Sequence, residues 1–281
     1  MNVLSLFDGM GGAMLALQLA GHHVDTYITS EICPKGNKLV AQHYPNTKQM
    51  GSVEHWKEWD VAWDKVDLVI GGSPCQGFSS MGEGRNFKDP RSRLFFTFAD
   101  IVKHIQQLNP NVKFLLENVR MKSDWKDVIS KELQVQPFDY DSKTTGPCRR
   151  PRSYWMNFKP TLPDENDISW MEVVDGNVTK MSDSWYKWWE VNSSRQLAKM
   201  YSELHTDTTT KGITMTARQY ASWNGNFLLK DGEIFKPNQR GLALLAGAPA
   251  AYLDTVSQRT AEEMTGNGWC LRTVSQLLKG L

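Results

Sequence analysis

The 281-residue chain has few cysteines, no long apolar run and almost no net charge. Its four cysteines are Cys33, Cys75, Cys148 and Cys270, and no two of them have the Cys-x-x-Cys spacing of a zinc site or redox pair. We therefore expect neither a disulfide scaffold nor a bound metal. A reducing compartment such as the cytoplasm is the expected location.

Membrane and secretion signals are also lacking. No apolar run approaches the roughly 20 residues of a membrane-spanning helix, and the N-terminus turns acidic too early for a signal peptide. The formal net charge of +1 means that a nucleic acid would have to be bound by a local basic patch. The length allows one large α/β domain, or such a domain with a small insert.

The N-terminal residues have the pattern strand, glycine-rich turn, helix. Apolar residues 3–6 run into Phe7-Asp8-Gly9-Met10-Gly11-Gly12, and a helical stretch follows to residue 20. This pattern opens nucleotide-binding βαβ units, although glycine turns also serve packing alone. Glu31 follows the next predicted strand, residues 24–29, and would either bind ribose hydroxyls or cap the next helix.

Residues 47–50 are a candidate third strand, and a single cysteine follows the fourth predicted strand. The apolar residues 66–70 end at two glycines, and Pro74 stiffens the backbone before Cys75. Open α/β sheets carry their chemistry at the carboxyl ends of strands, so Cys75 is either a nucleophile or a small buried apolar residue. The polar loop 76–92 follows, and its cations would bind phosphate or simply be solvated.

An acid ends the next apolar run. Residues 112–119 read Val-Lys-Phe-Leu-Leu-Glu-Asn-Val, between helices expected at 94–108 and 124–132. A buried strand rarely ends in an acid without a reason, so we favour a chemical role for Glu117 over a helix cap. After a further strand near 134–139, Arg149, Arg150 and Arg152 lead into an aromatic strand, and arginine offers fixed donors for carbonyls, carboxylates or phosphates.

Apolar periodicity fades between residues 159 and 236, where Ser, Asp, Asn, Thr and Trp are frequent. Helical patterns resume at 237–250 and 256–264, and a last helix is expected to end at residue 278. We therefore predict that 1–158 and 237–281 form one α/β domain. Residues 159–236 would form a small insert with little α/β rhythm.

In this order, the motifs resemble those of the C5-cytosine DNA methyltransferase family. Matches run through positions 1–158 and about 213–281. Residues 3–9, 67–75 and 93–96 are most similar to the animal de novo enzymes, and residues 74–79 are also close to bacterial and phage enzymes. The matching segments are Phe7-Asp8-Gly9-x-Gly11, Glu31, Pro74-Cys75-Gln76, Glu117-Asn118-Val119, Arg150-x-Arg152, Gln239-Arg240-Gly241-Leu242 to Tyr252, and Gly266-Asn267.

The resemblance implies a Rossmann-like class I S-adenosylmethionine-dependent methyltransferase fold, with 159–236 as the target-recognition domain. It implies a DNA (cytosine-5-)-methyltransferase that acts on a cytosine flipped out of double-stranded DNA. Cys75 would attack C6 of the ring, and Glu117 would hold N3. Arg152 would contact the O2 side of the base, with Arg150 as the second candidate and Asn118 beside them.

The resemblance also implies which residues would hold the two ligands. Residues expected at the S-adenosylmethionine are Phe7, Asp8, Gly9, Gly11, Glu31, Ile32, Ser52, Val53, Pro74, Asn267 and Trp269. Residues expected at the DNA are Gln76, Ser79, Arg85, Lys88, Arg91, Arg93, Thr214, Thr216 and Arg218.

Two positions depart from the family pattern. Ser52 stands where an Asp usually meets the adenine amino group, and Cys148 stands where a glutamine usually precedes Arg-x-Arg. The alternatives are an RNA cytosine methyltransferase on the same fold, an inactive DNA-binding relative, and a nicotinamide oxidoreductase, whose third glycine is replaced here by Met14. We expect a monomeric stand-alone enzyme of a bacterium or phage, of the restriction–modification kind, in the cytoplasm of the bacterial cell.

Overall fold

The computed structural model describes residues 1–74, 93–184, 187, 191, 202–207, 209–219 and 224–281. These residues form two compact units. The first contains Met1–Tyr140, Pro151–Thr161 and Ser275–Leu281, and the second contains Asp141–Arg150 and Leu162–Val274.

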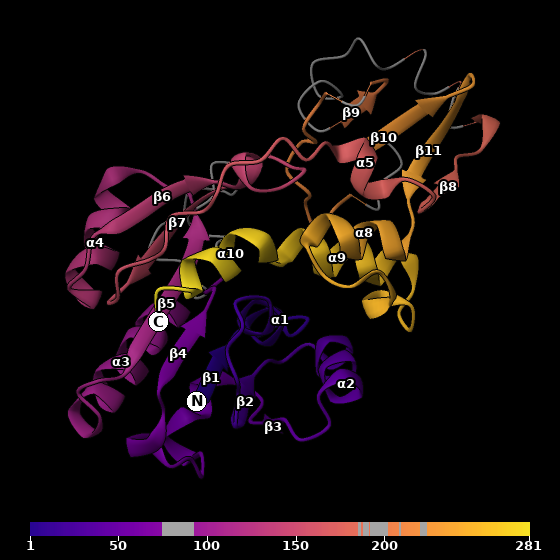
Figure 1. The fold of residues 1–281 in the computed structure, drawn as a ribbon. Helices are drawn as coiled ribbons and strands as arrows, with labels where there is room; N and C mark the ends of the chain where they lie inside the picture. The colour runs from indigo at the N-terminus through magenta and orange to yellow at the C-terminus, as the bar shows by residue number, and fades with distance from the viewer. Residues whose placement is uncertain (75–92, 185–186, 188–190, 192–201, 208, 220–223) are drawn as a thin grey trace. The chain divides into compact units, whose positions relative to one another are not determined.

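The first unit is built on a seven-stranded sheet with the order β3-β2-β1-β4-β5-β7-β6 (Figure 1). Strands β1 to β5 pair in parallel, whereas β7 pairs antiparallel with β5. The parallel strands therefore all end at one edge of the sheet, and β7 begins at that edge. The strands are β1 (Asn2–Leu6), β2 (Thr26–Ser30), β3 (Lys48–Gln49), β4 (Leu68–Gly71), β5 (Lys113–Val119), β6 (Pro137–Asp141) and β7 (Pro151–Met156).

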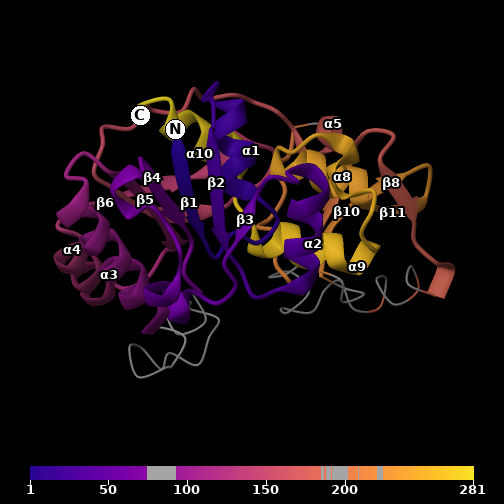
Figure 2. The same ribbon diagram turned by 90° about the horizontal axis from the view of Figure 1, so that it is seen from below.

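Helices cover this sheet because their apolar residues recur on one face. In α3 the apolar face of Phe95, Phe98, Ile101, Val102 and Ile105 is fully buried. Figure 2 shows α3 and α4 side by side, where Lys103 pairs with Glu132 at 2.6 Å. The helices are α1 (Gly12–Leu19), α2 (Pro34–His43), α3 (Arg93–Leu108) and α4 (Ser123–Leu133), with short 3-10 helices η1 (Val53–Glu58) and η2 (Trp63–Lys65).

The sequence predicted this part of the chain well. Each expected strand and helix between residues 2 and 156 is present, with ends shifted by a few residues. The α/β class with a mainly parallel, Rossmann-like sheet is confirmed.

The second unit holds a sheet of its own, in the order β8-β11-β10-β9 (Figure 1). Strands β10 and β11 form a hairpin whose two turn residues, Asp231 and Gly232, both have positive φ. Asp-Gly is a strong sequence signal for this turn, and it was missed in the prediction for residues 159–236. The strands are β8 (Val178–Lys180), β9 (Ser202–His205), β10 (Gly225–Lys230) and β11 (Glu233–Pro237).

Helices accompany this second sheet, together with two more 3-10 segments. They are α5 (Trp170–Val174), η4 (Ser142–Thr144), α8 (Gln239–Ala246), η5 (Ala250–Leu253) and α9 (Gln258–Asn267), and α10 (Leu271–Leu278) continues into the first unit. The second unit thus contains residues 237–274, which the sequence analysis grouped with the catalytic domain. The functional division at 158/159 and 236/237 stays a prediction.

Among the helices that the structure describes, none has the length and apolar composition of a membrane span.

A buried polar network lies in the second unit. Lys236 of β11 pairs with Glu262 of α9 at 3.0 Å, and both side chains are at most 10% exposed. Gln219 donates to the Glu262 carbonyl at 2.8 Å and to Thr265 at 3.1 Å, and its own carbonyl accepts from Lys236. The network therefore fixes the segment around Gln219 against α9. Burial lowers the pKa of Lys236, and Glu262 opposes that shift.

We expect Glu262→Gln to destabilise the protein by about 3 kcal/mol, because it leaves the Lys236 ammonium buried without its counter-charge. Glu263→Gln is the matched control. The Glu263 carboxylate, next to Glu262 in the sequence, forms a solvent-accessible pair with Arg259 at 3.0 Å. Such pairs contribute less than about 1 kcal/mol to stability. Urea unfolding of both variants measures the difference. Equal midpoints for the two would show that the buried pair contributes nothing.

Candidate functional site

The glycine turn after β1 is held against the end of β2. The backbone N–H groups of Phe7 and Asp8 both donate to the carbonyl of Ser30, at 2.8 and 3.3 Å. Gly9 and Gly11 have φ of 61° and 80°. A Cβ at Gly9 would meet nothing within 4 Å, so its conformation rather than lack of space requires glycine.

Glu31 joins this turn to the start of α2. One carboxylate oxygen accepts from Gly9 N at 2.9 Å, and the other accepts from Ile32 N and Cys33 N, both at 2.8 Å. Glu31 does not cap α2 itself, because the N-cap is Cys33 and it has no side-chain cap. Three of about four acceptor positions of the Glu31 carboxylate are used locally, and one remains for a ligand hydroxyl. The neighbouring side chain of Ile32 is 75% exposed, so its apolar surface is available to pack against a flat ring of a ligand.

Gly36 is a residue that the sequence analysis missed. A Cβ at this position in α2 would lie 2.3 Å from the carbonyl oxygen of Gly9, so only glycine lets the helix approach the turn. A glycine inside a helical pattern is itself a signal for close packing, and it would have identified this position.

Asp8, within the turn, is held by hydrogen bonds from two buried hydroxyl groups. Its buried carboxylate accepts from Ser5 Oγ at 2.6 Å and from Tyr27 Oη at 2.5 Å. Tyr27 Oη in turn accepts from Met14 N of α1 at 3.2 Å. Burial raises the pKa of Asp8 to about 6; the two hydroxyls oppose the shift, and Glu31 adds to it. The side chain thus braces α1, and its predicted contact with the cofactor stays a prediction.

The other predicted cofactor residues occupy different settings. Ser52 caps η1 by accepting from Glu54 N at 3.3 Å, and Val53 is buried in the core. Pro74 is half-buried just after β4. Asn267 ends α9 and Trp269 follows it, both in the second unit. Their contribution to a cofactor pocket stays a prediction.

At the edge of the sheet, β7 brings an arginine to the acid of β5. Arg152 Nε lies 2.7 Å from a carboxylate oxygen of Glu117, and both side chains are about one-tenth exposed. The antiparallel register places Val119 opposite Arg152 and Glu117 opposite Tyr154. The structure therefore brings together two residues that the sequence placed only in separate motifs.

Asn118 links this pair of strands to the segment that precedes the cysteine. Its side-chain amide donates to the carbonyl and the hydroxyl of Ser73, at 3.2 and 3.1 Å. Ser73 lies two residues before Cys75. The predicted site residues Cys75, Gln76, Ser79, Arg85, Lys88 and Arg91 lie outside the described residues.

Arg150 has different surroundings from Arg152. It is buried in the second unit, and its guanidinium donates to the carbonyls of Met215 at 3.0 Å, Gly266 at 3.1 Å, and Gly268. Two of these carbonyls lie at the C-terminal end of α9, where a cation is favourable. Arg150 therefore holds this helix end, and it is Arg152 that meets Glu117.

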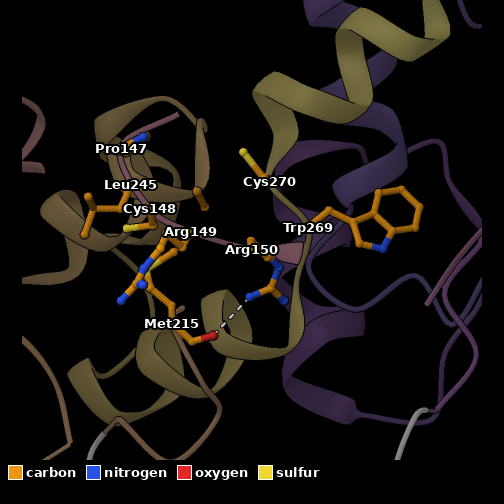
Figure 3. A pocket seen from close by; sticks show the side chains of 9 residues that line it. Pro147, Cys148, Arg149, Arg150, Met215, Leu245, Trp269 and Cys270 are labelled. Atoms are coloured by element: carbon orange, nitrogen blue, oxygen red, sulfur yellow. Dashed lines mark hydrogen bonds between the residues drawn. The ribbon is translucent and has the colours of Figure 1, made fainter. Parts of the chain in front are cut away.

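Arg150 is one of the residues that line a small pocket in the second unit (Figure 3). Burial raises the pKa of the Cys148 thiol far above its usual range, so this departure from the family pattern is an inert packing residue. A Cβ at Gly212 would lie 2.9 Å from its sulfur. The pocket is lined by Pro147, Cys148, Arg149, Arg150, Met215, Leu245, Ala246, Trp269 and Cys270.

The remaining predicted DNA-binding residues that the structure describes are spread over both units. Arg93 forms an exposed pair with Glu54 at 2.6 Å in the first unit. Thr214 Oγ1 donates to the carbonyl of Arg149 at 2.8 Å in the second unit. The backbone of Thr216 packs closely against Gly266 of α9. A Cβ added at Gly266 would lie only 2.1 Å from the carbonyl carbon of Thr216. Arg218 is exposed.

Comparison with known proteins gives a consistent result. The family model of the C-5 cytosine-specific DNA methylases matches residues 1–144. The type II methyltransferase M.Eco47II of Escherichia coli is 36% identical over 119 residues, which are 42% of this chain and 27% of that protein. M1.ScrFI of Lactococcus lactis subsp. cremoris is 25% identical over 308 residues, covering 97% and 76%. The chain spans 27%, 30% and 49% of the length of three such relatives.

Solved structures agree on the fold. The Entamoeba histolytica methyltransferase EhMeth superposes with a TM-score of 0.76 at 14% identity, covering 99% of this chain and 97% of that one. The S. pombe Dnmt2 methyltransferase gives 0.70 at 17% identity, with the same coverage. The predicted Rossmann-like methyltransferase fold is thereby confirmed.

We expect Asp8→Asn to stabilise the protein increasingly as the pH rises. The folded state holds the Asp8 proton up to a pH near 6, whereas the unfolded chain releases it near 4. The wild type therefore loses stability across this interval, and the uncharged asparagine does not. The advantage of the variant should grow by on the order of 2 kcal/mol between pH 4 and pH 7.

Urea unfolding at several pH values measures this difference. Asp60→Asn, at a fully exposed carboxylate, is the control and should track the wild type. A constant difference between Asp8→Asn and wild type across the pH range would contradict a buried, proton-binding Asp8.

Proposed function

Because the chain belongs to the C-5 cytosine-specific DNA methylase family, we propose that it transfers a methyl group from S-adenosylmethionine to C5 of a cytosine in double-stranded DNA. The single observation that carries this proposal is the Glu117–Arg152 pair at the carboxyl edge of the sheet. It places an acid and a fixed cation beside the strand that leads to Cys75. The family relatives are bacterial type II methyltransferases, which supports a restriction–modification role.

The side chains divide the chemistry between them. The Cys75 thiolate adds to C6 of the ring, and the new S–C6 bond moves electron density to C5. Glu117 holds the ring at N3 and stabilises the added charge there. Arg152 binds the O2 side while it keeps Glu117 in place. Once C5 carries the methyl group, loss of the C5 proton to solvent and release of the thiolate from C6 restore the aromatic ring.

Asn118 acts on the nucleophile through the backbone. Because its amide holds both the carbonyl and the hydroxyl of Ser73, the direction of the chain is set two residues before Cys75. The ring carbon must come within bonding reach of the sulfur, so this anchoring reduces the cost of orientation.

The turn of the first unit fits an adenosine-containing cofactor. Bound S-adenosylmethionine supplies the electrophilic methyl group. Glu31 keeps one acceptor position for the ribose, Ile32 offers an exposed apolar face for the adenine, and Gly9 leaves space above the turn. Asn267 and Trp269 complete the pocket in this proposal.

The substrate base must leave the helix stack, because its C5 and C6 faces are covered in a duplex. Residues 159–236 recognise the target in this proposal, by contacts in the major groove. The cations of the loop 76–92 and Arg93 bind the DNA backbone. The cytoplasm of a bacterial cell is the proposed location.

One assay tests the proposal. The chain is incubated with S-adenosylmethionine labelled in its methyl group and with duplex DNA, transfer RNA or no nucleic acid. We expect label on DNA cytosine only, and none with Cys75→Ser. Label on RNA alone, or label on DNA that survives Cys75→Ser, would contradict the proposal.

Glu117→Gln should lower the rate of methyl transfer by about 100-fold or more, because glutamine has no carboxyl group to share a proton with N3 as charge develops there. Glu132→Gln is the control, since Glu132 forms a partly exposed pair on α4 and should keep the wild-type rate. Single-turnover transfer to DNA measures both variants. An unchanged rate in Glu117→Gln would remove this residue from the mechanism.

A further inference from the structure

Two segments of the second unit run side by side as a short parallel ribbon. Gly212 N donates to the carbonyl of Pro147 at 2.7 Å, and Arg149 N donates to the carbonyl of Gly212 at 2.8 Å. Cys148 and Gly212 form the bridge between them. The ribbon joins the arginine-rich segment to the threonine-rich segment, which are more than 60 residues apart in the sequence.

Both ends of this ribbon are secured by side chains. Arg150 donates to the Met215 carbonyl on one side, and Lys211 Nζ donates to the carbonyls of Gly146, Asn166 and Ile168 on the other. The backbone at Arg149 therefore has little freedom, although its side chain is at the surface.

The side chains of the three arginines in this region have three different surroundings. Arg150 is buried on backbone carbonyls, and Arg152 pairs with Glu117. Arg149 is exposed, and its side chain points away from that of Arg150, as neighbours on an extended strand do (Figure 3). Its guanidinium has no hydrogen-bond or ion-pair partner among the residues that the structure describes.

Thr214 has a specific relation to Arg149. Its hydroxyl donates its single proton to the Arg149 carbonyl at 2.8 Å, so that proton is not available for a phosphate oxygen. Thr214 was expected to contact the DNA backbone. That contact stays a prediction, and the hydrogen bond points to a role for Thr214 in positioning the main chain of Arg149.

We propose that Arg149 binds a DNA phosphate, with Thr214 and the ribbon holding its backbone in place. The proposal rests on the proposed function, since it assigns a new contact to the same substrate. Guanidinium presents two parallel donors that fit a phosphate, and a fixed backbone reduces the entropy lost when the side chain is ordered. Arg218 follows on the same threonine-rich segment and is also exposed, so the surface offers a second cation nearby in sequence.

Salt-dependent binding separates a phosphate contact from a structural effect. The dissociation constant of the full chain for a labelled duplex is measured by fluorescence anisotropy between 50 and 300 mM KCl. Arg149→Gln should weaken binding about 5-fold or more at low salt and reduce the log–log salt slope by about 0.9, the share of one phosphate. Arg149→Lys should keep the slope.

A matched control is Arg259→Gln, because Arg259 is exposed on α9 in the same unit and pairs with Glu263. It should bind and respond to salt as the wild type does. If Arg149→Gln matches Arg259→Gln in affinity and slope, the proposal is overturned.

The role of Thr214 is tested by its dependence on Arg149. Thr214→Val should weaken DNA binding about 3-fold, Thr214→Ser should restore it, and Thr214→Val should have no added effect in Arg149→Gln, because coupled residues are non-additive. Additive losses in the double variant would contradict the positioning role. Thermal unfolding confirms that each variant is folded.

The failure of this proposal differs from the failure of the proposed function. A wild-type chain that methylates DNA while Arg149→Gln binds normally overturns only the Arg149 contact. A wild-type chain that neither binds nor methylates duplex DNA overturns the proposed function and this contact with it.

Discussion

The reversal of β7 against β5 is the constraint on which the candidate site depends. Parallel strands carry their carboxyl ends to one edge, so β1, β2, β4 and β5 deliver the glycine turn, Glu31, Ser73 and Glu117 there. An antiparallel neighbour begins where its partner ends. Arg152, near the start of β7, therefore reaches Glu117 at 2.7 Å. A parallel β7 would have carried that arginine to the opposite edge of the sheet.

The same edge is made rigid by contacts that the backbone provides. Glu31 holds Gly9, Gly36 lets α2 approach the turn, and Asn118 holds Ser73. The second unit uses a comparable device, because Arg150 and the Lys236–Glu262 pair fix the segment 212–219 against α9. In both units, polar side chains hydrogen-bond to the main chain of segments that carry predicted site residues, which limits the motion of those segments.

Much of the first unit could be predicted from the sequence, because its strands are continuous apolar runs and its helices have clear apolar faces. Glu117 and Glu31 were found as acids placed just after such runs. Strand direction is not encoded in periodicity, so the pairing of Arg152 rather than Arg150 with Glu117 could not be foreseen. The second sheet was not predicted because its strands have only three to six residues, too few to show a periodic pattern. The turn residues Asp231-Gly232 are a sequence signal that indicates its hairpin.

Cys75, which follows β4 at the carboxyl edge of the sheet, is the proposed nucleophile that attacks the cytosine ring. The most direct measurement uses a duplex substrate in which the target cytosine carries fluorine at C5, with S-adenosylmethionine present. Fluorine cannot leave as a proton does, so the thiol that added to C6 stays bound. Peptide mapping by mass spectrometry should find the DNA adduct on Cys75. An adduct on Cys33, Cys148 or Cys270, or no adduct with a duplex that is methylated in its unfluorinated form, would contradict the account.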